Sequence, residues 1–208
     1  HMVGAKCQDL RKWNYFANGV DAANTLFDNL LTEPYAAFDF VGKNTDNGYS
    51  VWASNVIYNE TMKKYVMYFC TTSSYVKSTL CFATADNIEG PYTYVDTILY
   101  SGYGKSNISE TNLYDVLGKN ADISRYLEYG GYNNKEWPNC IDPAIFTDAD
   151  GRMWMNYGSW SGGIFLLEID PTTGYPIYPV DDKDADPYYG YRLIGGGHHS
   201  AEGPYIQY

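Results

Sequence analysis

The stretch that decides the fold runs from residue 139 to residue 163. It reads Asn-Cys-Ile-Asp-Pro-Ala-Ile-Phe, then Thr-Asp-Ala-Asp-Gly, then Arg-Met-Trp-Met-Asn-Tyr-Gly-Ser-Trp-Ser-Gly-Gly. Two apolar runs flank an Asp-Gly turn signal at 148–151, and this pattern predicts a β-hairpin. Asp142 precedes Pro143, and proline belongs at the first residues of a strand because it has no N–H to donate to a neighbour. The pattern therefore predicts a carboxylate at a strand mouth, where a charge can reach a cavity.

The same order of short strands occurs twice in the chain. One unit is predicted at residues 52–58, 65–70, 78–85 and 92–95, and a second at 144–146, 153–158, 163–169 and 175–178. Units of four short antiparallel strands are typical of β-propeller blades. The predicted fold class is therefore all-β. Blades are expected at 52–100 and 139–180, with the end of an earlier blade at 3–16 and the start of a later one at 200–208.

Long connections separate these units. A segment at 101–138, rich in Tyr, Asn and Gly, forms an insertion between the two predicted blades. Loops longer than about 15 residues are usually functional, so we place it on the rim of a cleft. The polar stretch before the first blade is interpreted as a loop with one short helical turn near Asp21–Leu31. His1-Met2 has the character of an expression remnant, so the lack of a signal peptide says nothing about export.

Composition restricts the class of partner. The 208 residues suffice for one domain with a core, and the formal net charge is −11. Such a charge argues against nucleic acid and anionic membranes as partners, because phosphate contacts need Lys and Arg. No apolar run approaches the roughly 18 residues of a membrane span. Most of the 23 tyrosines are expected to fill sheet positions, while exposed aromatic faces would suit sugar rings.

The metal-ligating residue types form no strong motif. The four cysteines make no Cys-x-x-Cys pair, so a zinc site is not predicted. Cys70 and Cys81 lie on neighbouring predicted strands and either pair or remain buried thiols. His198-His199 is accompanied by no third ligand, and a polar rim is favoured over a metal site. The segment 148–151 lacks the distal Glu of a calcium loop and is interpreted as a hairpin turn.

A second acid stands at the mouth of another short apolar run, in Ser-Ala-Glu-Gly-Pro-Tyr-Ile at 200–206. In a propeller the innermost strand of each blade lines the central channel, so Asp142 and Glu202 are expected at the same end of one channel. Two carboxylates facing a cavity suit acid–base work on a glycosidic bond, provided that one stays protonated near neutral pH. The alternative is that both acids cap strands or bind backbone N–H groups.

Several segments together resemble glycoside hydrolase family 43, in the endo-arabinanase branch of the five-bladed propeller enzymes. They follow the order of the family and spread over about three quarters of the chain: Trp52–Tyr58, Ile141–Phe146, Asn156–Trp160, Gly163–Asp170 and Ala201–Ile206. One departure is Ser54-Asn55, where many relatives carry Pro-Asp or Pro-Glu. The resemblance implies that the chain holds two blades of a five-bladed propeller and the edges of two others.

The resemblance also implies roles for individual residues. Family members invert at the anomeric carbon with three acids. Glu202 matches the general acid, and Asp142 matches the acid that tunes the pKa of the general acid and orients it. The general base lies in an Asp-Pro context of the first blade that this chain lacks, and neither Asp9 nor Asp21 fits that role. Candidate substrate-binding residues are Trp52, Asn139, Ser159 and Trp160, with core packing or turn formation as the alternatives.

The function implied by this resemblance is hydrolysis of α-1,5-L-arabinan within the polymer. Two alternatives remain: an exo-acting α-L-arabinofuranosidase or β-xylosidase of the same family, and a non-catalytic carbohydrate-binding propeller fragment. No cofactor is expected to be required, although a structural calcium ion in the channel is compatible with the family. The substrate would be arabinan or arabino-oligosaccharide, in a secreted, periplasmic or cell-surface bacterial protein. The remaining part of the propeller is a possible partner as another chain, and the 208 residues alone are expected to be inactive.

Overall fold

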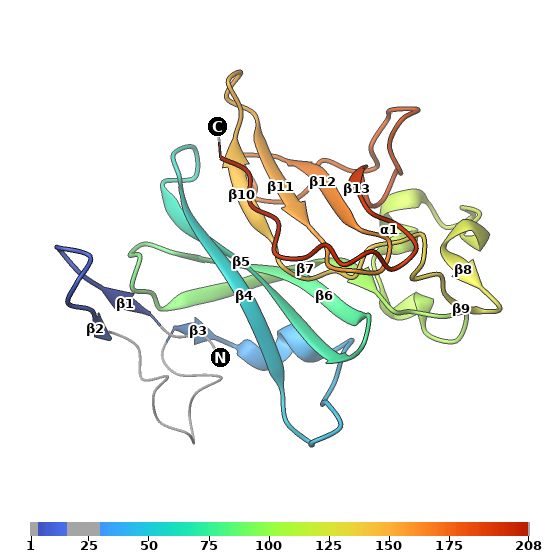
Figure 1. Ribbon diagram of the computed structural model, residues 1–208, viewed down its shortest axis with the longest axis horizontal. Helices are drawn as coiled ribbons and strands as arrows, with labels where there is room; N and C mark the ends of the chain where they lie inside the picture. Colours follow the sequence, from blue (N-terminus) through green and yellow to red (C-terminus); the bar gives the residue numbers. More distant parts are fainter. Residues whose placement is uncertain (1–3, 16–29, 208) are drawn as a thin grey trace.

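Two large sheets make up most of the computed structural model, which describes residues 4–15 and 30–207 (Figure 1). The first sheet has the order β3-β7-β6-β5-β4, and only the pair β3–β7 is parallel. Its strands are β3 (Leu31–Thr32), β4 (Ser50–Asn59), β5 (Lys64–Ser74), β6 (Lys77–Ala85) and β7 (Tyr92–Ser101). The four antiparallel strands predicted for the first unit are therefore present, each longer than expected.

The middle of this sheet is buried on both faces. All residues of β5 from Val66 to Thr71 are buried. A strand that is covered on both faces has a continuous rather than an alternating run of apolar residues. Tyr68 is fully buried, stacks on Phe82 and donates a hydrogen bond to the carbonyl of Gly174 in the turn after β12 (2.8 Å). This tyrosine thus serves the core and joins the first sheet to a turn of the second.

The second sheet contains β10 (Ala144–Thr147), β11 (Met153–Tyr157), β12 (Ile164–Ile169) and β13 (Tyr191–Ile194) in that order, all antiparallel. The predicted hairpin at 148–151 joins β10 to β11. Its turn is held by Asp148, whose carboxylate accepts the backbone N–H groups of Asp150 and Arg152. Asp148 is thereby committed to a turn, as the sequence pattern indicated.

The fourth strand of the second sheet was wrongly predicted at 175–178. That segment makes only an isolated bridge between Ile169 and Pro176, and the strand that pairs with β12 is β13. Pro176 and Pro179 remove N–H donors that a ladder needs. The chain therefore passes through a further loop before it returns as β13, so the predicted range 139–180 ends too early.

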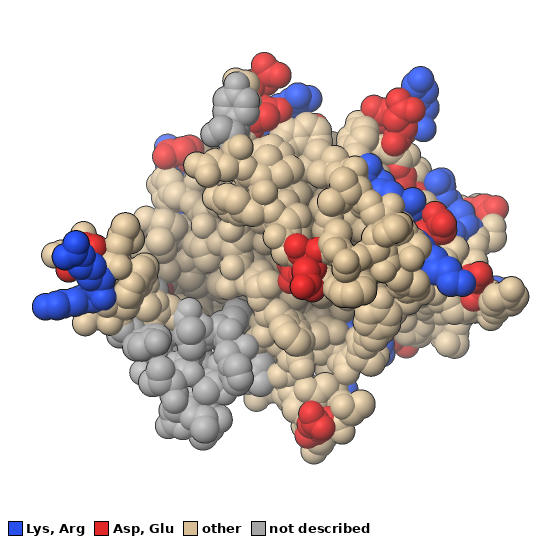
Figure 2. Space-filling view, in the orientation of Figure 1, with Lys and Arg blue, Asp and Glu red and all other residues tan. Residues whose placement is uncertain are grey.

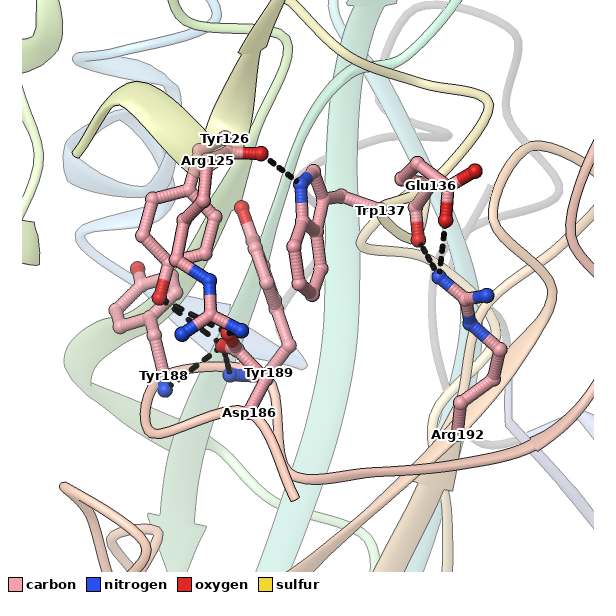
Figure 3. Close-up of polar contacts among 8 residues, drawn as sticks. All are labelled: Arg125, Tyr126, Glu136, Trp137, Asp186, Tyr188, Tyr189 and Arg192. Atoms are coloured by element: carbon pink, nitrogen blue, oxygen red, sulfur yellow. Dashed lines mark hydrogen bonds and ion pairs between the residues drawn. The ribbon is translucent and has the colours of Figure 1, made fainter. Parts of the chain in front are cut away.

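The insertion at 101–138 folds into short elements: η2 (Ile108–Glu110), α1 (Leu113–Leu117), η3 (Ser124–Tyr126), β8 (Leu127–Glu128) and β9 (Gly131–Tyr132). It lies at the far end of the molecule from β1 and β2 (Figure 1). A cluster of aromatic rings fixes it to the loop before β13. There Trp137 stacks on Tyr189, and both Tyr188 and Tyr189 pack against Tyr126 (Figure 3).

The N-terminal segment forms a small two-stranded sheet of β1 (Ala5–Lys6) and β2 (Asn14–Tyr15). The turn through Asp9 occurs as expected, since its carboxylate accepts the N–H groups of Arg11 and Lys12. The helical turn expected near Asp21–Leu31 lies almost wholly outside the described residues. A 3-10 helix that was not predicted, η1 (Pro34–Phe38), follows β3.

The cysteines Cys70 and Cys81 do not pair. Cys70 stands opposite Leu80 in the β5–β6 ladder and Cys81 stands opposite Phe69, so the two thiols project from opposite faces of the sheet. Both are buried free thiols, and burial raises the pKa of each, to about 12 for Cys70 and about 11 for Cys81. The thiol alternative is the correct one.

The innermost strands of the two sheets, β4 and β10, lie beside one another. The side-chain oxygen of Asn55 accepts the N–H of Ile145 (3.2 Å), and the amide of Asn59 donates to the carbonyl of Pro171 (2.9 Å). Adjacent four-stranded units with their first strands toward a common centre form the arrangement of propeller blades. No helix among the described residues is long and apolar enough to cross a membrane.

Candidate active site

A cavity of about 430 Å³ lies where β4, the end of β5 and the segment before β10 meet the C-terminal segment. Hydroxyl groups, aromatic rings and two carboxylates line it: Ser50, Trp52, Thr72, Ser73, Ser74, Tyr75, Asn139, Ile141, Asp142, Ser159 and Glu202. A second hollow of about 470 Å³ continues past Asp142 and Glu202 toward Pro204 and Tyr205. Asp142 and Glu202 are thus shared by both hollows and stand between them.

Asp142 and Glu202 are neighbours in space. The carboxylate of Asp142 accepts the backbone N–H of Gly203 (3.3 Å), the residue that follows Glu202. Burial raises the pKa of Asp142, the hydrogen bond from Gly203 lowers it, and the charge of Glu202 raises it further. Loss of hydration and a nearby like charge both disfavour the ionised form. The predicted juxtaposition of the two acids is therefore present.

Glu202 is held from the second sheet by Trp160. The indole N–H of Trp160 donates to a carboxylate oxygen of Glu202 (3.2 Å), and its backbone N–H donates to the carbonyl of Ala201 (2.7 Å). The loop after β11 thereby fixes the segment that carries Glu202. The carboxylate is oriented by a single side-chain donor and keeps lone pairs available for a ligand.

The charge at the Asp142–Glu202 pair is negative. Among residues 4–15 and 30–207, Asp142 and Glu202 are the only charged residues that line either hollow. Figure 2 shows an acidic patch at the centre of this face with uncharged residues around it, whereas Lys and Arg occur toward the edges, mostly beside acids. A site of this kind suits a neutral ligand with polar groups rather than an anion.

Unusual backbone conformations gather around the cavity. Positive φ angles, which non-glycine residues rarely adopt, occur at Ala53 (42°), Asp142 (55°), Trp160 (47°), Ser161 (43°) and His198 (64°). Ala53 lies at the irregularity in the β4–β5 register between Trp52 and Asn55. Conformations of this kind persist where surrounding contacts fix them, and they are often found at functional sites. Here Ala53 and Asp142 line the hollows, and Trp160 contacts Glu202 beside them.

The four candidate substrate-binding residues differ in position. Trp52, Asn139 and Ser159 line the cavity, whereas Trp160 touches it only through Glu202. Trp52 and Trp160 are 55% and 43% exposed, so neither packs in the core. Asn139 and Ser159 are buried, and the side-chain oxygen of Asn139 accepts a long hydrogen bond from Ser101 (3.5 Å). Trp52 therefore lines the cavity with an exposed side chain, whereas Asn139 lines it as a buried residue.

Two features of the cavity differ from the expectations. None of the residues 102–138 lines either hollow, so the insertion does not form the rim of the cleft. Its carbonyl groups at Lys135 and Trp137 accept N–H groups of Gly197 and Gly162 instead, behind the wall of the site.

The end of β5 was not predicted to contribute to the cavity, although the run Thr72-Ser73-Ser74-Tyr75 offers the hydroxyl and aromatic groups that suit a sugar.

Metal-ligating side chains do not gather at the site. Within residues 4–15 and 30–207, no three His, Cys, Asp or Glu side chains are placed to hold a metal ion. His198 is engaged by Tyr75, whose hydroxyl lies 3.3 Å from its Nδ1.

Comparisons with known proteins agree with this geometry. The chain is 34% identical over its whole length to the extracellular endo-α-(1→5)-L-arabinanase of Thermotoga petrophila and to the extracellular endo-α-(1→5)-L-arabinanase 2 of Bacillus subtilis. It spans 39% and 38% of the length of these two relatives. An extracellular exo-α-(1→5)-L-arabinofuranosidase of Cellvibrio japonicus matches over 43 residues at 40% identity, 21% of this chain and 12% of that protein. A scan against protein-family models finds no match.

Solved structures give the same result. The family 43 glycoside hydrolase YxiA of Bacillus licheniformis superposes on the whole chain with a TM-score of 0.73 at 32% identity, over 40% of its own length. The endo-1,5-α-L-arabinanase of Thermotoga petrophila covers 98% of the chain with a TM-score of 0.70 at 32% identity, also over 40% of its own length. The chain is thus part of a five-bladed β-propeller of the glycosidase type, as predicted. It belongs to glycoside hydrolase family 43.

Proposed function

We propose that this protein is an endo-acting glycosidase that cleaves α-1,5-L-arabinan with inversion at the anomeric carbon. The observation that carries the proposal is the contact of Asp142 with the Glu202 segment, at the boundary between two connected hollows. A polymer that enters through one hollow and leaves through the other would pass both acids. The full-length relatives, which are named endo-arabinanases, support the substrate class.

In the proposed mechanism Glu202 is the general acid. Its carboxyl proton moves to the glycosidic oxygen as the bond from that oxygen to the anomeric carbon breaks. Water attacks the anomeric carbon from the opposite face, and a base accepts the proton that water loses. Trp160 orients the Glu202 carboxyl through its indole N–H. Asp142, placed beside Glu202 through its hydrogen bond from Gly203, orients the segment that carries the acid.

The general base is assigned to a part of the propeller outside the described residues. Asp142 and Glu202 are the only acids that line the hollows, so no third described carboxylate is available there. An inverting site needs a separation of about 6.5–9.5 Å between acid and base, which leaves room for the water. The remaining propeller could be supplied by the same polypeptide or by another chain, and the proposal holds for either.

An endo mode is favoured over an exo mode by the position of the 102–138 insertion. An exo-acting enzyme needs an element that closes one end of its cleft, and the 102–138 insertion was the candidate for this element. Because that insertion lines neither hollow, it does not close the cleft within the described part of the chain. A structural calcium ion in the channel is part of this proposal, and no step is assigned to it.

The proposed location is outside the cytoplasm, since the relatives that span this chain are named extracellular. Placement in the periplasm or on the cell surface is a finer proposal. The proposed substrate is a neutral polysaccharide, as suits a cavity without Lys or Arg.

The proposal is tested by assaying the protein expressed from its complete gene. Debranched linear arabinan, an aryl α-L-arabinofuranoside and an aryl β-D-xyloside are the three substrates, and the products are sized by chromatography. We expect rapid shortening of the polymer with oligosaccharide products and little release from the aryl glycosides. Release of single sugars from the ends would support the exo alternative instead. Binding of arabinan without any cleavage would leave only the carbohydrate-binding alternative.

A further inference from the structure

Tyr75 stands at the end of the cavity that lies away from the second hollow. It occupies the tight turn between β5 and β6, where Ser74 pairs with Lys77. Its ring reaches across to the second sheet, and its hydroxyl lies 3.2 Å from the hydroxyl of Ser161 and 3.3 Å from Nδ1 of His198. The turn of one sheet is thereby joined to a loop of the other across the end of the site.

The Tyr75 ring is both exposed and fixed. The residue is 61% exposed although its backbone and its hydroxyl are both held. An aromatic face that is already immobilised loses little conformational freedom when a ligand packs against it. An exposed ring with an occupied hydroxyl is what a stacking platform for a sugar requires.

Serine hydroxyl groups line the same cavity as this ring and the acids. Ser73 and Ser74 line the cavity, and neither side chain takes part in a hydrogen bond within the described part of the chain. Thr72 and Ser50 differ from them, because Thr72 bonds to the carbonyl of Lys77 and Ser50 accepts the amide of Asn44. The two serines therefore keep donors and acceptors for a polyhydroxylated ligand.

We propose that Tyr75, with the hydroxyls of Ser73 and Ser74, forms a sugar-binding subsite that is separate from the acid pair. This inference rests on the proposed function and adds a specificity element to it. The subsite would take a neutral furanose unit of the same chain, one or more units away from the bond that is cleaved. Its ligand is neutral because no charged residue lines this end of the cavity.

A purely positioning role for Tyr75 predicts different behaviour. Its hydroxyl also holds Ser161 and His198, and the loop of His198 leads directly to Glu202. If Tyr75 acted only through this loop, loss of the hydroxyl would impair turnover of every substrate, including the shortest. If Tyr75 is a platform, loss of the ring would weaken binding of long substrates and leave turnover intact.

The test compares Tyr75→Phe and Tyr75→Ala with the wild type, each expressed from the complete gene, on linear arabino-oligosaccharides of increasing length. Tyr75→Ala is expected to raise KM about tenfold for the longer oligosaccharides with kcat unchanged, the effect of one lost aromatic contact. The shortest cleavable oligosaccharide should show no change. Tyr75→Phe is expected to stay within about twofold of the wild type. Tyr129→Ala, at a fully exposed tyrosine of the insertion, is the matched control and should change neither parameter.

The outcomes separate the two proposals. If the wild type cleaves arabinan but Tyr75→Ala keeps the wild-type KM on long oligosaccharides, the subsite is refuted and the function stands. Equal loss of kcat in Tyr75→Phe and Tyr75→Ala on all lengths would refute the subsite in favour of the positioning role. If the wild type neither binds nor cleaves arabino-oligosaccharides, both proposals fall. A Ser73→Ala variant with raised KM on the same long substrates would support the subsite independently, and an unchanged KM would remove Ser73 from it.

Discussion

Two aspartates of the second sheet region share a raised pKa and differ in nearly everything else. Asp142 borders the open cavity and accepts one long hydrogen bond, from Gly203. Asp186 is 6% exposed and accepts the hydroxyl of Tyr126 and the N–H groups of Tyr188 and Tyr189. Its second oxygen lies 3.3 Å from the guanidinium of Arg125 (Figure 3).

Burial is the first cause of the raised pKa at both positions. At Asp186 the opposing contributions come from Tyr189, Tyr188, Arg125 and Tyr126, all of which favour the carboxylate. At Asp142 one backbone N–H opposes burial, and Glu202 adds to it. A raised pKa therefore does not mark a functional acid by itself. Unused lone pairs and a like-charged neighbour beside a cavity distinguish Asp142 from an acid that holds the fold together.

The largest expected effect comes from Glu202→Gln. Removal of the proton that the proposed general acid donates should lower kcat on linear arabinan by about 10²–10⁴-fold, with the free energy of unfolding unchanged. Aryl arabino-oligosaccharides with an acidic phenol should be affected much less, because their leaving group needs no proton. Rates on both substrates are measured, with Glu60→Gln, at an exposed glutamate of the β4–β5 turn, as control. Equal losses on both would contradict the acid role.

Replacement of Asp186 should act on stability instead. Asp186→Ala leaves the Tyr126 hydroxyl and two buried N–H groups without an acceptor and removes the partner of Arg125. The expected loss is about 3 kcal/mol, which lowers the melting temperature by roughly 6–12 °C in a domain of this size. Calorimetry checks this, with the exposed neighbour Asp184→Ala as control. An unchanged melting temperature would show that the cluster is dispensable.

A smaller effect is expected where the two sheets meet beside the acids. Asn55→Ala removes the acceptor for the N–H of Ile145 and should cost about 1 kcal/mol. Urea unfolding measures the loss, and Asn87→Ala, in an exposed turn of the first sheet, is the control. If both variants unfold at the wild-type midpoint, the Asn55 bond does not contribute to the joint between the sheets.

The smallest effect concerns the pH dependence of stability at Asp142. Its pKa is raised in the folded state, so its contribution to stability is present below the ordinary Asp pKa and is lost as pH rises through the raised value. Asp142→Asn lacks this titration. The variant should therefore gain stability relative to the wild type as pH increases from about 4 to neutral, as followed by urea midpoints. A constant difference across that range would indicate an unperturbed carboxyl.

Sequence patterns predicted those parts of the fold that depend on local chemistry. Turn signals and strand periods predict the Asp148 turn, the four strands of the first unit and the position of Asp142 at the mouth of β10. The position of β13 could not be predicted this way. Residues 175–178 look like a strand, and only the prolines at 176 and 179, together with the competition of β13 for the edge of β12, decide the pairing.

The candidate site also combines features that sequence patterns predict with features that they do not. Asp142 and Glu202 could be brought together because the repeat predicts both at strand mouths, although only Asp142 precedes a strand and residues 201–207 form none. The contribution of Tyr75 could not be found, because it depends on a turn of one sheet reaching a loop of the other, more than 80 residues away. The insertion at 102–138 was misplaced for a related reason. Its Tyr126 and Trp137 pack against Tyr189 of the loop before β13 and hold it behind the site, and loop length alone does not predict such a direction.

The most direct test of the account measures arabinan hydrolysis and thermal unfolding together for Asp142→Asn and Asp186→Ala. Both are made in the protein expressed from its complete gene, and rates are expressed per folded molecule. The account predicts about a hundredfold lower rate without any loss of melting temperature for Asp142→Asn. For Asp186→Ala it predicts a wild-type rate with a clearly lower melting temperature. A wild-type rate for Asp142→Asn would contradict the assignment of the Asp142–Glu202 pair as the catalytic centre.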